Sequence, residues 1–224
     1  MFRNLLSFWK GKDFLAQVFE EFKSMLDDTE TMFRTVCGRL LDNVDEPGLK
    51  QRIYDIDQKV NRLQKDIRKR VVEHLTLQPT VDVAACLVLM SVVKDAERLG
   101  DYCKNLYEVT ELLEKPLSRE LFSRYFNGID KDILTLFEQT KGAFIEADED
   151  KARLTWEYKT RLTKDCNRIV AELVKCDLSV NEAACLVLIS RYFKRLVAHL
   201  VNISTSVILP LSDLDYFDEK RQIE

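Results

Sequence analysis

The residue pair best placed for chemistry is formed by Glu97 and Asp101. The two acids are four positions apart in a stretch with helical periodicity, so both side chains lie on one helix face. Neighbouring carboxylates repel, and each makes the other harder to ionise, a penalty that a bound cation relieves. Carboxylate oxygens suit hard or borderline cations such as Fe, Mn, Mg or Ca. The sequence YDID adds Asp55 and Asp57 on the preceding helical stretch.

The alternative to a metal site is a solvated helix face, on which Glu97 pairs with Arg98 or Lys94. The sequence contains no GxSxG and no HExxH, and neither His74 nor His199 forms the ExxH pair of a ferritin-like di-iron bundle. We therefore expect no catalytic activity, and we expect His199 to be a core or interface residue. Phosphate is not an obvious ligand either, because no glycine-rich loop or arginine fork presents a pocket.

The composition predicts long helices with few connections. Only six glycines and four prolines occur among 224 residues, too few for the tight turns of a sandwich, barrel or propeller. The longest apolar run, residues 83–93, is too short to span a bilayer. A net charge of −4 argues against nucleic acid as the main partner. Six cysteines without a CxxC pair indicate buried thiols in a reducing compartment.

Helical spacing of apolar residues predicts six helices. The apolar stripes run over residues 14–40, 49–75, 81–113, 121–144, 154–173 and 180–207. Breaks fall at NVDEPG (residues 43–48), at Pro79, at Pro116, at the acidic stretch 146–150 and at Pro210. The first eleven residues carry bulky apolar side chains and lack a small-residue cleavage site. We expect an amphipathic segment packed on the first helix; the alternative is a short membrane-surface element.

An internal repeat divides the chain into halves. Residues 81–91 read VDVAACLVLMS and residues 180–190 read VNEAACLVLIS, identical at eight of eleven positions. This predicts an all-α fold of two tandem three-helix bundles. The expected units are an N-terminal segment 1–11, a first bundle 12–114, a second bundle 115–209 and a tail 210–224.

The stretch DAERLGDYCKNL, residues 95–106, resembles the D-x-ERIGD motif of the PhoU family of phosphate-signalling proteins. The upstream stretch also resembles that family: it begins with IYDID at residue 53, continues as an amphipathic helix and has Pro79 before the next helix. A second copy, RYFKRLVAHLVNIS, keeps Arg195, Leu196 and Asn202 but has Lys194 and Ala198 in the places of the two acids. The resemblance spans about residues 12–207.

The resemblance implies a cytoplasmic regulator that contacts the ATPase of the phosphate ABC transporter and the partnered sensor histidine kinase. Such a protein damps the phosphate-starvation response, forms a homodimer and meets the inner face of the membrane only through its partners. Some members bind iron clusters or other divalent metals through carboxylates on the bundle surface. Carried over to this chain, the metal ligands are Glu97 and Asp101, with Asp57 and Asp95 as further candidates. Lys159, Lys194 and Ala198 argue against a second cluster.

Three other functions stay open on the sequence. The chain could be an accessory protein of a sodium–phosphate or other phosphate carrier, since some PhoU-like proteins accompany such carriers. It could be a metal-binding helical scaffold without a signalling role, in which the two acids form a solvated face. A metal-dependent enzyme would need a general base beside the metal, and the sequence offers no clear candidate.

Overall fold

The computed structural model describes residues 13–42 and 46–215, and within those ranges the chain forms helices and no strand. The elements are α2 (Asp13–Asp42), α3 (Leu49–Leu77), α4 (Val83–Leu112), α5 (Arg119–Phe126), α6 (Ile129–Glu146), α7 (Glu149–Leu173), α8 (Val180–Thr205) and the short 3-10 helix η1 (Leu211–Asp213). The predicted all-α fold with a repeated three-helix bundle is confirmed. The segment 1–11 lies outside the described residues, and the bounds proposed for the two bundles stay predictions.

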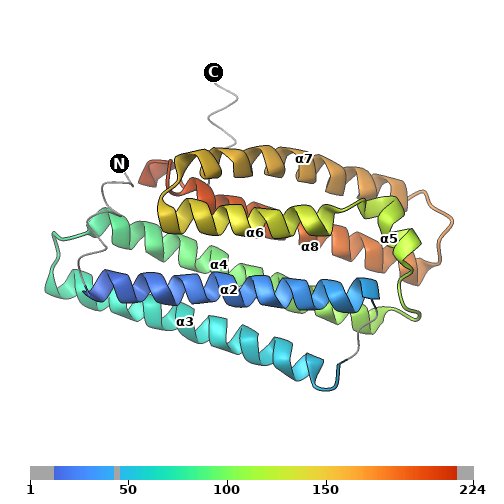
Figure 1. The fold of residues 1–224 in the computed structure, drawn as a ribbon, viewed down its shortest axis with the longest axis horizontal. Coiled ribbons are helices and arrows are strands. Elements are labelled where there is room, and N and C mark those ends of the chain that lie inside the picture. Colours follow the sequence, from blue (N-terminus) through green and yellow to red (C-terminus); the bar gives the residue numbers. More distant parts are fainter. Residues whose placement is uncertain (1–12, 43–45, 216–224) are drawn as a thin grey trace.

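The helices lie along the long axis of the molecule in two groups (Figure 1). α2, α3 and α4 pack against one another, and α6, α7 and α8 form the second group, with the short α5 at one end. The groups meet along a seam where α4 packs on α8 and α2 packs on α6. The helix that carries Glu97 and Asp101 therefore contacts its own bundle on one side and the other half of the chain on another.

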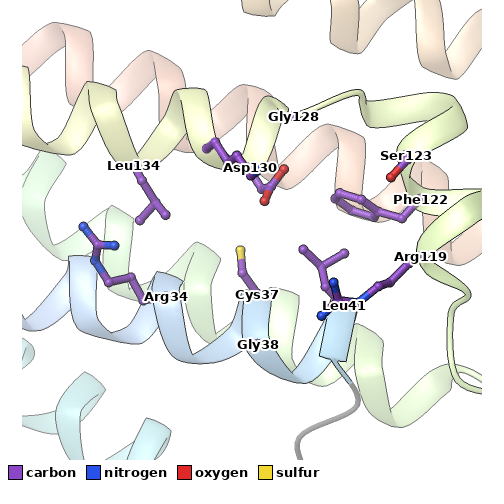
Figure 2. Close-up of a pocket in the computed structure, with 11 residues that line it drawn as sticks. Arg34, Cys37, Gly38, Leu41, Arg119, Phe122, Ser123, Gly128, Asp130 and Leu134 are labelled. Carbon is purple, nitrogen blue, oxygen red and sulfur yellow. The ribbon is translucent and has the colours of Figure 1, made fainter.

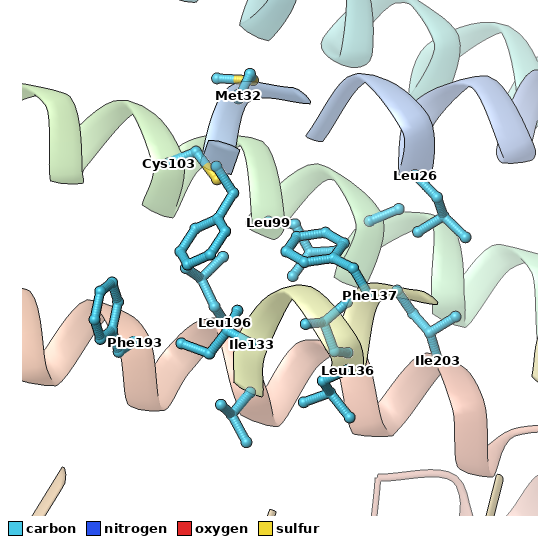
Figure 3. Close-up of a cluster of buried hydrophobic side chains, with 14 of the residues drawn as sticks. Leu26, Met32, Leu99, Cys103, Ile133, Leu136, Phe137, Phe193, Leu196 and Ile203 are labelled. Carbon is cyan, nitrogen blue, oxygen red and sulfur yellow. The ribbon is translucent and has the colours of Figure 1, made fainter. Parts of the chain in front are cut away.

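The two halves share one apolar core rather than holding two separate ones (Figure 3). Leu99 of α4 and Leu196 of α8 are both fully buried at the seam. The ring of Phe33 lies 5.8 Å from the rings of both Phe137 and Phe193, so aromatic contacts join α2 to α6 and α8. Because burial of apolar side chains is favourable, these contacts between the halves contribute directly to folding stability.

The helix expected over residues 121–144 is in fact two helices. Asn127 ends α5 with φ of 41°, and Gly128 precedes α6 with φ of 86°. Both values fall in the left-handed region, which glycine adopts readily and asparagine tolerates better than most residues. The apolar stripe continues across the break, so periodicity alone does not reveal it.

The remaining connections follow the sequence signals more closely. The side chain of Ser118 accepts a hydrogen bond from the Leu121 amide at the start of α5, and Ser179 accepts one from the Glu182 amide at the start of α8. Asp148 caps α7 in the same way through the amides of its first turn. Among the helices of the described chain, none is long and apolar enough to cross a membrane.

Candidate functional site

Three of the four predicted metal ligands lie together where α3 packs on α4. Asp57 of α3 is buried, and the side chains of Glu97 and Asp101 on α4 are 17% and 24% exposed. Gly100 lies between the two α4 acids on the helix. A Cβ at Gly100 would sit 3.8 Å from an oxygen of Asp57, which is an ordinary van der Waals contact, so the packing of α3 on α4 does not require a glycine here.

A lysine that sequence reasoning missed occupies the centre of this group. The Nζ atom of Lys104 lies 3.0 Å from Asp57 Oδ2 and 3.3 Å from Asp101 Oδ1. Arg98 adds a 2.8 Å ion pair to the other oxygen of Asp101. We refer to Asp57, Glu97, Asp101 and Lys104 as the acid–lysine cluster. The spacing of three residues between Asp101 and Lys104 on one helix is the signal that could have found it.

The charges of the cluster shift the pKa values of two of its members. Burial raises the pKa of Glu97, and the nearby carboxylates of Asp101 and Asp57 raise it further. Burial alone lowers the pKa of Lys104, but its hydrogen bonds to Asp57 and Asp101 outweigh that effect and leave it above the ordinary value. Glu97 has only a long ion pair, 3.8 Å from Arg98 Nε. It is therefore the acid of the cluster with the weakest internal partner.

The carboxylates of the cluster suit a divalent cation, but Lys104 already balances the charges of Asp57 and Asp101. Among the residues that the structure describes, no three acidic, histidine or cysteine side chains come together closely enough to hold a metal ion. The ammonium group of Lys104 bridges the two aspartates that would be ligands. A metal would have to displace this ammonium group, whose side chain is 21% exposed.

Asp95, the fourth predicted ligand, lies on a different face of α4. Two positions along a helix turn a side chain by about 200°, which takes Asp95 away from Glu97 and toward the seam with α8. There Asp95 Oδ1 lies 2.7 Å from His199 Nδ1 and 3.4 Å from the amide nitrogen of Asn202. The ring of Tyr102 stacks on His199 at 5.6 Å. His199 is thus an interface residue, as predicted, and Asp95 is its partner.

The second half has no equivalent acid pair in the described structure. Lys194 donates a hydrogen bond to Asn167 at 2.9 Å, and the ammonium group of Lys159 lies 4.5 Å from the centre of the Trp156 ring. The first contact is a hydrogen bond and the second a cation–π contact, and neither brings carboxylates together.

A second feature, which the sequence did not predict, is a pocket of about 480 Å³ at the seam (Figure 2). It lies between the last turns of α2, the helix α5 and the first turn of α6. We call it the seam pocket, and its lining includes Arg34, Cys37, Gly38, Arg119, Asp130 and Lys131. It forms beside the break at Gly128. Burial first, and then the charge of Asp130, raise the pKa of the Cys37 thiol well above its ordinary range, so this cysteine is not a reactive thiolate.

Comparison with known proteins gives one consistent result. The family model of the PhoU domain matches residues 22–110. A Synechocystis protein described as a phosphate-specific transport system accessory protein PhoU homolog is 25% identical over 192 residues, covering 80% of each chain. PhoU homolog 1 from Thermotoga maritima, with the same description, is 23% identical over 203 residues, covering 87% of this chain and 81% of that one.

Solved structures show the same fold. The crystal structure of PhoU from Pseudomonas aeruginosa superimposes with a TM-score of 0.75 at 22% identity, covering 87% of this chain and 95% of that one. The phosphate transport system regulatory protein PhoU from Streptococcus pneumoniae gives 0.70 at 17% identity, covering 88% and 95%. The likeness extends over both halves, while the family match lies on α2, α3 and α4, the helices that hold the acid–lysine cluster.

Proposed function

We propose that this chain, which belongs to the PhoU family, is an accessory protein of phosphate transport and acts as a negative regulator of phosphate uptake and phosphate-starvation signalling. The observation that carries the proposal is the family match over α2, α3 and α4, supported by similarity to accessory proteins over most of the chain. In this role the protein is an adaptor between a phosphate transporter ATPase and a sensor kinase. It works as a homodimer in the cytoplasm and reaches the membrane only through its partners.

Binding rather than chemistry explains the arrangement of the site best. Lys104 holds Asp57 and Asp101 of the acid–lysine cluster together, and among the described residues no histidine or reactive cysteine joins these acids as a base or nucleophile. Glu97 lacks a short internal partner and is partly exposed. A basic group of a partner protein that pairs with Glu97 would lower the free energy of one complex relative to another, which is how an adaptor shifts a signalling equilibrium.

A divalent metal, with iron as the first candidate, is the second ligand that we propose for the cluster. When bound, it would supply positive charge to Asp57, Glu97 and Asp101 in place of Lys104. The metal and the lysine would then be alternatives, so metal content depends on how readily Lys104 gives up its two ion pairs.

A phosphatase reporter of the starvation response tests the regulatory role. In the source cell grown with ample phosphate, deletion of the gene should switch the reporter on, and the wild-type gene should switch it off again. The double variant Glu97→Gln/Asp101→Asn should fail to restore repression. The matched control Glu146→Gln/Asp150→Asn changes another pair of acids four positions apart, one at the end of α6 and one in the first turn of α7, and should restore it.

A reporter that stays off in the deletion strain would reject the regulatory role. If phosphate uptake falls in that strain while the reporter stays off, the accessory role belongs to a phosphate carrier instead. Binding of the wild type and of the double variant is then measured to purified transporter ATPase and to purified sensor kinase. The partner whose binding weakens with the double variant is the one that contacts the acid–lysine cluster.

A further inference from the structure

The seam pocket combines features that the proposed adaptor role does not use. Its walls come from both halves of the chain, with α2 on one side and α5 and α6 on the other (Figure 2). Its volume of about 480 Å³ lies within the usual size range of small-molecule sites. We propose that the seam pocket binds a small phosphorylated ligand, either free phosphate or the phosphate ester of a small polyol, whose hydroxyl group donates a hydrogen bond to Asp130.

Asp130 is the feature that selects a hydrogen-bond donor. Only 9% of this residue is exposed, and its side chain points into the pocket from the first turn of α6 (Figure 2). Within the described part of the chain its carboxylate has no hydrogen-bond or ion-pair partner. The acceptor positions of this carboxylate are therefore open to the pocket, where the hydroxyl group of a ligand can donate to them.

The surrounding charges select an anion. Arg34, Arg119 and Lys131 line the pocket from three different helices, and Figure 2 shows the two arginines on either side of Asp130. The guanidinium group of Arg34 also pairs with Glu30 at 2.6 Å, so part of its charge is balanced within the protein. α6 begins at Gly128 without a side-chain cap, so the positive end of its dipole also faces this region. The pocket thus offers positive charge around the Asp130 carboxylate, and a ligand must match both.

Phosphate chemistry meets both requirements, and sulfate does not. Phosphate near neutral pH keeps an O–H group, and a polyol phosphate carries hydroxyls beside its phosphoryl group. Sulfate has the same shape and charge but no proton to donate, so its oxygens would face the Asp130 carboxylate with like charge. The Asp130 carboxylate should therefore discriminate between the two anions.

Gly38 shows that the pocket is open on the α2 side and provides a way to close it. A Cβ at Gly38 would meet no heavy atom within 4 Å, although glycine within a helix is less stable than alanine by about 1 kcal/mol. Gly38→Leu should fill the space with apolar atoms, while Gly38→Ala changes the backbone in the same way and leaves most of the space open.

Isothermal titration of the full chain with inorganic phosphate, glycerol 3-phosphate and sulfate at equal ionic strength tests the proposal. We expect at least one phosphorylated ligand to bind at least tenfold more tightly than sulfate. Asp130→Asn should remove that difference, and Gly38→Leu should abolish binding that Gly38→Ala retains. Asp132→Asn, in the same turn of α6 but paired with Arg161 at 2.8 Å, is the matched control and should bind as the wild type does.

The preferred ligand identifies its source, since tighter binding of glycerol 3-phosphate indicates an ester and tighter binding of inorganic phosphate indicates the free ion. Equal affinity for sulfate and phosphate would overturn the proposal, because it would mean attraction of any anion. Absence of binding by both phosphorylated ligands would overturn it as well. The measurement needs no partner protein, so its failure is separate from failure of the regulatory role.

Discussion

Replacing Lys104 with methionine tests how the acid–lysine cluster is balanced. Lys104→Met keeps a long apolar side chain but leaves Asp57, which is 7% exposed, without its 3.0 Å partner. Removing one partner of a fully buried ion pair destabilises a protein by about 3–5 kcal/mol. Because the lysine side chain is 21% exposed, we expect a smaller loss of about 2–3 kcal/mol in the free energy of unfolding at neutral pH.

A divalent cation should reverse this loss in the variant and have less effect on the wild type. A metal present at 100 times its dissociation constant stabilises the folded state by about 2.7 kcal/mol, close to the deficit that the variant creates. Urea unfolding of both proteins with a chelator measures the stability that the variant loses. Repeating it with Fe²⁺ or Mn²⁺ measures the stability that the metal restores. Lys59→Met removes an exposed lysine that pairs with Asp28 at 2.7 Å, and should change stability by less than about 1 kcal/mol.

Two results would refute this reasoning. If Lys104→Met unfolds at the same urea concentration as the wild type, the ion pairs of Lys104 do not balance the cluster. If added metal stabilises both proteins equally, Lys104 and the cation do not compete. Since pairing raises the Lys104 pKa, its contribution is complete at neutral pH and is lost only as the pH rises above the ordinary lysine value of about 10.4.

Three further predictions concern neighbouring residues. Burial raises the Glu97 pKa, so the ionised carboxylate opposes folding and the protonated one does not. Glu97→Gln should therefore be more stable than the wild type at pH 7. Below about pH 4, where Glu97 is protonated in both states, urea titration should show the two proteins unfolding alike. Gly100→Ala should raise stability by up to about 1 kcal/mol, because its new Cβ meets ordinary contacts of 3.7–3.8 Å; a lower melting temperature would contradict this. Phe137→Ala should destabilise the whole chain by about 3–5 kcal/mol in one calorimetric transition, whereas two separated transitions would show that the halves unfold independently.

Helix positions were predictable because apolar spacing and turn residues determine them locally. The start of α2 at Asp13 and the start of α8 at Val180 follow from such signals. The break between α5 and α6 was not predicted, since apolar residues keep their helical spacing on both sides of it and only the backbone angles of Asn127 and Gly128 reveal it. The seam pocket depends on that break, so it could not be predicted either.

Only the side-chain positions that follow from spacing along a single helix were predictable for the site. Spacing on α4 correctly put Glu97 and Asp101 on one face, and the structure adds Asp57 from α3. The sequence gives no direct account of contacts between distant helices, so the pairing of Asp95 with His199 across the seam was missed. Spacing on α4 also puts Lys104 within reach of Asp101, but its bridge to Asp57 depends on how α3 packs on α4.

The shared core also determines how two molecules of this protein could exchange parts. Each half presents a mostly apolar, buried face at the seam, and a single connection, residues 113–118, joins the halves between α4 and α5. Neither face can remain in water, so a half separated from its neighbour would pair with the complementary half of another molecule. Changing the length of this connection should therefore yield domain-swapped dimers in place of two independent bundles.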